Sequence, residues 1–167
     1  MNTTIVVIAH NIRSTHNVGS FFRTCDGFGV AHLYLTGYTP YPAVLGDARL
    51  PHITSKLTAQ IHKTALGAEQ TLPFSYAEDP LQVVAKLQQD GYELLALEQT
   101  PTATMLPEYT PTHAKIALLL GEEVHGIPPE ILAAADSAIE IPMQGTKESF
   151  NVSVALGIAL YGLSISH

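Results

Sequence analysis

The feature that most constrains the fold is an unbroken apolar run at residues 116–120. A strand with apolar side chains on both faces needs cover on both sides, which is typical of the centre of a parallel sheet. Apolar and β-branched segments predict further strands at 4–9, 32–36, 72–76, 92–97 and 139–141. Helical spacing, proline starts and glycine stops predict helices at 17–28, 53–66, 80–89, 129–135 and 151–164. This alternation predicts an α/β fold whose mostly parallel sheet has helices on both faces.

The length and composition fit one globular domain. The chain has 167 residues, of which 46% are hydrophobic, so it can bury enough surface to offset the entropy cost of folding. No apolar run approaches the roughly 18 residues that a membrane helix needs. The single cysteine, Cys25, excludes a disulfide framework and a cysteine-built zinc site, and no histidine or carboxylate pair has convincing metal-ligand spacing. We therefore expect a single cytoplasmic domain over residues 1–167, without a bound metal.

The charge is distributed unevenly along the chain. The net charge is −7, but residues 1–66 carry a balance of +3 and residues 67–167 a balance of −10. Such asymmetry permits a polyanion to bind the first part while the second keeps the protein in solution. Chance scatter of a few charges explains it equally well, so charge alone does not identify the partner.

The predicted last helix, residues 151–164, has almost no polar face. A helix that is apolar all round is buried all round. A terminal helix in so small a domain seldom finds that much cover within its own chain. The pattern favours a homodimer interface over simple burial in the core.

Three segments are unusual for a generic α/β sequence. The first, residues 11–25, places Asn17, Gly19 and Arg23 on a strand-to-helix turn, where free N–H groups and arginines can bind an anion. The alternative is a helix capped by Asn17, with a solvated arginine.

The second and third segments follow predicted strands. In residues 118–128, Gly121 lets a ligand approach the backbone at the carboxyl end of a strand, or it simply ends the strand. In residues 139–155, Ser149 and Asn151 can bind a ligand or cap the last helix, and capping is the simpler interpretation. The chain has no dinucleotide fingerprint, P-loop or nucleophile elbow.

Taken together and in order, these segments resemble the motifs of the SpoU (TrmH-like) RNA 2′-O-ribose methyltransferases of the SPOUT class. The matching stretches are NVGSFFRT at 17–24, GEEVHGI at 121–127 and IPMQGTKESFNVSVA at 141–155. The resemblance runs from about residue 4 to the C-terminus. It implies an α/β fold with a C-terminal trefoil knot, S-adenosylmethionine as cofactor, an RNA substrate (tRNA or rRNA) and a homodimer that packs through the knot and the last helix.

The resemblance also implies roles for individual residues. The cofactor-binding positions are Leu97, Gly121, Ile141, Met143, Ser149 and Phe150. The catalytic positions are Arg23, Asn17, Glu123, Ser149 and Asn151. With no separate RNA-binding domain, RNA contacts are expected from Arg13, Arg49, Lys56 and Lys63.

Methylating a ribose hydroxyl requires that the hydroxyl be oriented and its proton removed as the oxygen attacks the sulfonium methyl group; no metal is needed. Because arginine has a reference pKa of about 12.5 to 13.8, we favour Arg23 as a phosphate clamp and alkoxide stabiliser over a general base. Two alternatives remain at this stage. One is a homodimer that binds RNA or S-adenosylmethionine without catalysis, and the other is a Rossmann-like nucleotide-binding protein, which the missing glycine fingerprint disfavours.

Overall fold

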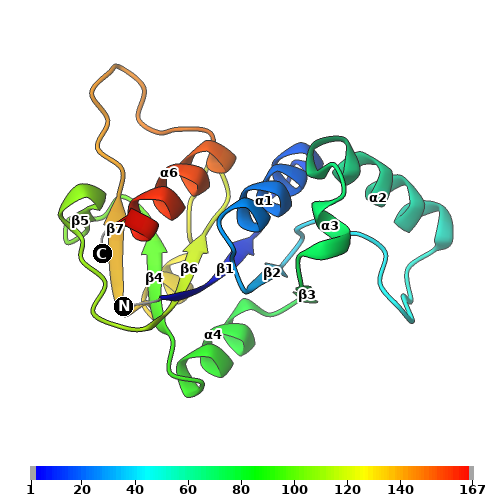
Figure 1. Cartoon of the computed structure of the whole chain (residues 1–167), viewed down its shortest axis with the longest axis horizontal. Coiled ribbons are helices and arrows are strands. Elements are labelled where there is room, and N and C mark those ends of the chain that lie inside the picture. The colour runs from blue at the N-terminus through cyan, green and yellow to red at the C-terminus, as the bar shows by residue number, and fades with distance from the viewer. Residues whose placement is uncertain (1–2, 166–167) are drawn as a thin grey trace.

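The computed structural model describes residues 3–165, and these form a seven-stranded parallel sheet with helices on both faces (Figure 1). The strands cross the sheet in the order β3-β2-β1-β6-β4-β7-β5. Their bounds are β1 (Thr4–His10), β2 (His32–Thr36), β3 (Phe74–Ala77), β4 (Glu93–Leu97), β5 (Thr104–Met105), β6 (Lys115–Leu120) and β7 (Ser137–Glu140). The expected α/β class is confirmed. The knot itself stays a prediction.

The apolar run that predicted a central strand is β6, which pairs with β1 on one side and β4 on the other. Alternate side chains of β6 enter different cores, so Leu118 packs on one face of the sheet and Leu119 on the other. Both are fully buried. Burial on both faces explains why β6 is apolar at every position from Ile116 to Leu120, after the exposed Lys115 at its start.

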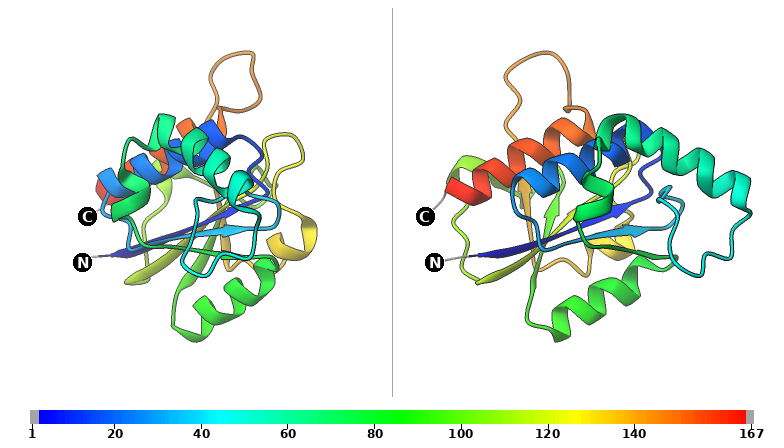
Figure 2. Two further views of the ribbon diagram at one scale, coloured as in Figure 1. Left: turned by 90° about the vertical axis from the view of Figure 1, so that its right-hand side faces the viewer. Right: turned by 45° about the vertical axis from the view of Figure 1, so that its right-hand side comes forward.

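The helices form two layers. They are α1 (Thr15–Gly27), α2 (Pro51–Ala65), α3 (Ala68–Thr71), α4 (Pro80–Gln89), α5 (Pro129–Leu132) and α6 (Val152–Ile165), with a 3-10 turn, η1 (Leu106–Glu108). Figure 2 shows α1, α2, α3 and α6 above the sheet and α4 and α5 below it. The short elements α3, β5 and η1 were not expected from the sequence, since two to four residues are too few to show a period.

Two helix starts differ in how they are capped. At α1 the cap is Ser14, whose hydroxyl accepts a hydrogen bond from the Asn17 backbone N–H at 3.3 Å. The expectation that Asn17 caps this helix was therefore wrong, and its carboxamide is available for another contact. At α6 the Asn151 side-chain oxygen accepts from the Ser153 N–H at 2.9 Å, which confirms the capping interpretation.

The last helix is only half covered by its own chain. One side of α6 is buried, including Leu156 and Leu160, while Val154, Tyr161 and Ile165 on the other side are 49%, 58% and 59% exposed. The expectation that its whole circumference is buried therefore does not hold within this one chain. Among residues 3–165, no helix is long and apolar enough to span a bilayer.

Candidate functional site

The carboxyl ends of three neighbouring strands enclose a cavity of about 420 Å³, which we call the loop cavity. Its walls come from residues 97–99 after β4, residues 120–126 after β6, residues 140–150 after β7, and the start of α6. In parallel α/β sheets this edge is where ligands bind, because the loops there converge. The position of the cavity therefore follows from the strand order.

The loop after β6 folds tightly back on itself. The Gly126 N–H donates to the Glu122 carbonyl at 3.0 Å, and Gly126 has a φ of +68°, which favours glycine. A Cβ on Gly121 would lie 2.5 Å from the Gly126 backbone, so no larger residue fits without displacing the loop. The two glycines thus bring bare backbone to the cavity wall.

Glu98 fastens this loop to the end of β4. Its carboxylate accepts hydrogen bonds from the Ile127 N–H at 2.8 Å and from the Gln99 N–H at 3.0 Å. Sequence reasoning missed Glu98 and Gln99. The available signal was two polar residues directly after a buried strand, at the carboxyl edge of the sheet.

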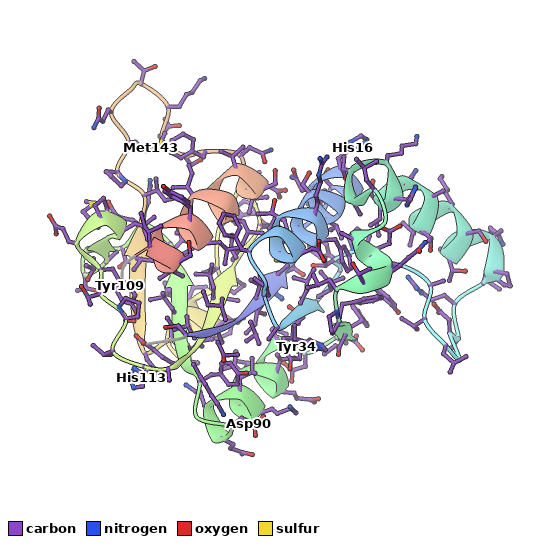
Figure 3. All side chains as sticks on the ribbon, in the orientation of Figure 1. His16, Tyr34, Asp90, Tyr109, His113 and Met143 are labelled. Atoms are coloured by element: carbon purple, nitrogen blue, oxygen red, sulfur yellow. The ribbon has the colours of Figure 1, made fainter. Side chains whose placement is uncertain are left out.

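The loop after β7 is exposed along most of its length and projects beyond the helical layer (Figure 1). Figure 3 labels Met143 at the base of this projection. The Gln99 side-chain amide donates to the Glu148 carbonyl at 2.7 Å, which ties the far end of the loop to the residues after β4.

The structure brings all the predicted cofactor-binding residues to one place. Each of them lines the loop cavity, although they come from three loops: Leu97, Gly121, Ile141, Met143, Ser149 and Phe150. Five of the six lie in the second and third family motifs, so the structure brings these two motifs together at one cavity.

The predicted catalytic residues are only partly assembled. Glu123 and Ser149 line the loop cavity, and the Asn17 carboxamide donates to the Glu123 carboxylate at 2.8 Å. Asn151 caps α6 next to the cavity. Arg23 lies about 9 Å further along α1 than Asn17, does not line the cavity, and is exposed without a hydrogen bond or ion pair to residues 3–165.

The carboxylate of Glu122, next to Glu123 in the sequence, is hydrogen-bonded to Tyr38. The Tyr38 hydroxyl donates to Glu122, and His125 lies 3.7 Å from the other Glu122 oxygen. The hydrogen bond from Tyr38 is the main reason that the pKa of Glu122 is below its ordinary value, and the same bond raises the pKa of Tyr38. Glu122 is thus held as a carboxylate at neutral pH.

On the far side of Tyr38 lies a second hollow of about 400 Å³, which we call the tyrosine groove. It is lined by Arg13, Thr15, Gly37, Tyr38, Thr39, Pro40, Tyr41, Arg49, Leu57 and Tyr76. The Arg13 guanidinium lies 5.8 Å from the centre of the Tyr38 ring. Of the four predicted RNA contacts, Arg13 and Arg49 line this groove.

Arg49 is already engaged within its own loop. Its guanidinium donates to Asp47 at 2.6 and 2.9 Å and to the carbonyls of Tyr41 and Pro42 at 3.0 Å each. It also lies 3.5 Å from the centre of the Tyr41 ring. Arg49 holds the pKa of Asp47 well below its ordinary value. Because four of the five guanidinium N–H donors are used internally, we assign Arg49 a structural role in place of the expected RNA contact.

The other two predicted RNA contacts, Lys56 and Lys63, are exposed on α2. They are seven residues apart, so they lie on the same side of the helix. Within the described part of the chain, no group of three or more histidine, cysteine, aspartate or glutamate side chains is arranged to hold a metal ion.

Comparisons with known proteins identify the family. The model of the SpoU rRNA Methylase family matches residues 4–161. The tRNA (guanosine(18)-2′-O)-methyltransferase of Aquifex aeolicus is 31% identical over 157 residues, which are 94% of this chain and 67% of that protein. The 23S rRNA (guanosine-2′-O-)-methyltransferase RlmB of Nitrosomonas europaea is 29% identical over 157 residues, covering 94% of this chain and 54% of that one.

A solved structure supports the same family. The crystal structure of the A. aeolicus TrmH/SpoU tRNA modifying enzyme superposes with a TM-score of 0.78 at 27% identity, covering 98% of this chain and 75% of that one. The chain thus spans about half to three quarters of the length of these relatives. The family match excludes the Rossmann-like alternative, and this chain belongs to the SpoU rRNA methylase family.

Proposed function

We propose that this protein transfers a methyl group from S-adenosylmethionine to a ribose 2′-hydroxyl of structured RNA, tRNA or rRNA. The observation that carries the proposal is the convergence of the predicted cofactor-binding residues on the loop cavity. The relatives' names support the reaction, and the greater identity to the A. aeolicus tRNA enzyme favours tRNA as the first substrate to test.

The loop cavity fits this cofactor. Its volume of about 420 Å³ is within the range of small-molecule sites, roughly 300–1,000 Å³. Five carboxylates line it, those of Glu98, Glu122, Glu123, Glu140 and Glu148, and no lysine or arginine among the described residues does. Such walls suit a ligand that carries a sulfonium and an ammonium group. S-adenosylmethionine supplies an electrophilic methyl group when bound.

The protein's own task is to orient and activate the ribose hydroxyl. We assign Arg23 to the phosphate next to that ribose and to the charge that develops on the attacking oxygen. Its exposed guanidinium, without an internal partner among residues 3–165, is free for this use. The Asn17–Glu123 hydrogen bond fixes the start of α1 to the cavity wall, so we assign these two to positioning. Ser149 lines the cavity, and Asn151, two residues further on, caps α6. We assign both to the catalytic site.

RNA binding is assigned to this single domain, in the cytoplasm. Arg13, Lys56 and Lys63 are exposed on the part of the chain with positive net charge and supply the phosphate contacts. A second copy of the chain doubles their number.

The uncovered side of α6 supports a homodimer. Val154, Tyr161 and Ile165 form a row on one side of the helix, and a second copy would remove them from water. Replacing Tyr161 by Glu should therefore produce monomers in analytical ultracentrifugation. The matched control is Leu81→Glu, on α4 at the opposite face of the sheet, which should leave the oligomeric state unchanged. Equal masses for the Tyr161 variant and the native protein would contradict the interface.

The decisive test of the function is transfer of tritiated methyl from S-adenosylmethionine to total RNA of a strain that lacks this gene. We expect label in a nuclease-resistant 2′-O-methyl dinucleotide, lost in Arg23→Ala. In Arg23→Lys, a kcat lower by about 100-fold with unchanged RNA affinity would assign Arg23 to chemistry, whereas a raised KM alone would assign it to anchoring. No label, despite measured binding of S-adenosylhomocysteine by a folded protein, would favour the catalytically inactive binding homodimer.

A further inference from the structure

The tyrosine groove is built from parts of the chain that no motif includes. Tyr38 and Tyr41 lie in the long connection after β2, and Tyr76 lies in β3. The rings of Tyr41 and Tyr76 stack at 4.1 Å with an angle of 14° between them. Arg49 covers the Tyr41 ring at 3.5 Å, so the arginine and the two rings form one continuous stack.

This stack is rigid. The Tyr76 hydroxyl donates to the Gly37 carbonyl at 2.6 Å, and Arg49 is fixed by its bonds to Asp47. Tyr38 is fixed at both ends, because its N–H donates to the Asn11 side chain at 3.0 Å and its hydroxyl donates to Glu122. A ligand that stacks here orders few further side chains, which lowers the entropy cost of binding.

The groove is both aromatic and cationic. Tyr38 is 50% exposed and Tyr76 is 36% exposed, while Arg13 is exposed beside the Tyr38 ring. None of the described residues that line the groove is acidic. Exposed aromatic rings next to arginine are the means by which proteins hold unpaired bases and their phosphates.

The groove also adjoins the loop cavity. Tyr38 lines the groove and its hydroxyl donates to Glu122, which lines the cavity, so this pair forms a shared wall. The groove and the loop cavity are therefore neighbours at the carboxyl edge of the sheet. We propose that the tyrosine groove binds the base of an unpaired nucleotide of the substrate RNA, next to the ribose that is methylated, with Arg13 on its phosphate. The proposal rests on the proposed methyltransferase function.

Binding of two labelled RNAs tests this proposal without requiring catalysis. One is a hairpin with a seven-nucleotide unpaired loop, and the other is a blunt duplex of equal length. Fluorescence anisotropy should show that the native protein prefers the hairpin. Tyr76→Ala should weaken hairpin binding by about tenfold and leave duplex binding unchanged, whereas Tyr76→Phe keeps the ring and the preference. Arg13→Ala, at an exposed position, should weaken binding of both RNAs.

The chain offers a matched control at the amino edge of the sheet. There Lys115 lies 5.4 Å from the Tyr92 ring and donates to the carbonyl of Asp90, which Figure 3 labels at the lower end of the molecule. Tyr92→Ala and Lys115→Ala should leave hairpin binding unchanged. Native hairpin affinity in both Tyr76→Ala and Arg13→Ala would overturn the groove proposal. If Tyr76→Ala and Arg13→Ala transfer methyl groups with an unchanged KM for RNA, the groove proposal is refuted and the proposed activity stands. If the native protein prefers the hairpin but transfers no methyl group, the proposed activity is refuted and the groove proposal stands.

Discussion

The loop cavity and the tyrosine groove share the Tyr38–Glu122 wall but differ in charge and in construction. The cavity is walled by glycine backbone, aliphatic side chains and five glutamates, whereas the groove is walled by tyrosines and two arginines. The difference teaches that the loops at one edge of a parallel sheet can place acidic and basic walls side by side. The order of strands in the sheet sets where the two sites lie, and the loop residues set the charge of each site.

The largest expected effect concerns the packing of the cavity wall. Gly121→Ala places a Cβ within 2.5 to 2.6 Å of the Gly126 and Ile127 backbone, so the loop must shift. We expect the free energy of unfolding to fall by about 2 to 3 kcal/mol. We also expect S-adenosylhomocysteine affinity, measured by calorimetry, to fall by about 100-fold. Gly145→Ala is the control, because a Cβ there meets nothing within 4 Å. Equal affinity in the two variants would mean that the cavity does not bind the cofactor through this wall.

Salt should weaken RNA binding much more than cofactor binding. In the proposed homodimer, Arg13, Lys56 and Lys63 of the two protomers would contact about six phosphates. Doubling the salt from 100 to 200 mM should then weaken binding of structured RNA by about 20- to 40-fold. Cofactor affinity should change by less than about twofold over the same range. Filter binding and calorimetry measure the two quantities. A salt slope that corresponds to ten or more released counterions would contradict this small footprint.

Neutralising Glu98, whose carboxylate holds the loop after β6, should moderately weaken cofactor binding and leave RNA binding unchanged. In Glu98→Gln the bonds to the Ile127 and Gln99 N–H groups lose their charge assistance, so cofactor affinity should fall by about fivefold. RNA affinity should stay the same, because Glu98 does not line the groove. Glu108→Gln, exposed on η1, serves as the control. If both variants bind S-adenosylhomocysteine as the native protein does, Glu98 has no part in shaping the cavity.

The smallest effect is a pH dependence beneath the groove. His10 is buried at the end of β1, under Gly37, and burial lowers its pKa; burial also lowers the pKa of His32. A histidine whose pKa is lowered by folding favours the folded state while neutral, and this stability is lost as the pH falls below about 6.5.

Thermal unfolding tests this effect. Lowering the pH from 7 to 5.5 should decrease the Tm by about 3 °C, and His10→Gln should reduce that decrease. His16→Gln, at an exposed position, should leave it unchanged. A Tm that rises over this range would show that the neutral form of His10 is not the one that folding favours.

How far the sequence predicts the site is clearest at α1 and the two loops. The family resemblance predicts Gly121, Ile141 and Phe150 as cofactor-binding positions, and they do meet in one cavity. The predicted N-cap of α1, Asn17, lies three residues after the observed one, Ser14. Both residue types are good caps, and only the path of the backbone selects between them. The sequence predicts Arg49 as an RNA contact. Its ion pair with Asp47 depends on the conformation of their loop, which residue type alone does not reveal.

The sequence by itself determined the alternation of strands and helices, the central place of β6 and the three family motifs. These are local properties, because periodicity and residue type act over a few neighbouring positions. The tertiary structure alone decided that Tyr38 meets Glu122 across 84 positions and that Tyr41 stacks on Tyr76. It also decided that one side of α6 stays open. Such contacts depend on the order of strands in the sheet and on the loop paths, and residue spacing along the chain does not encode either.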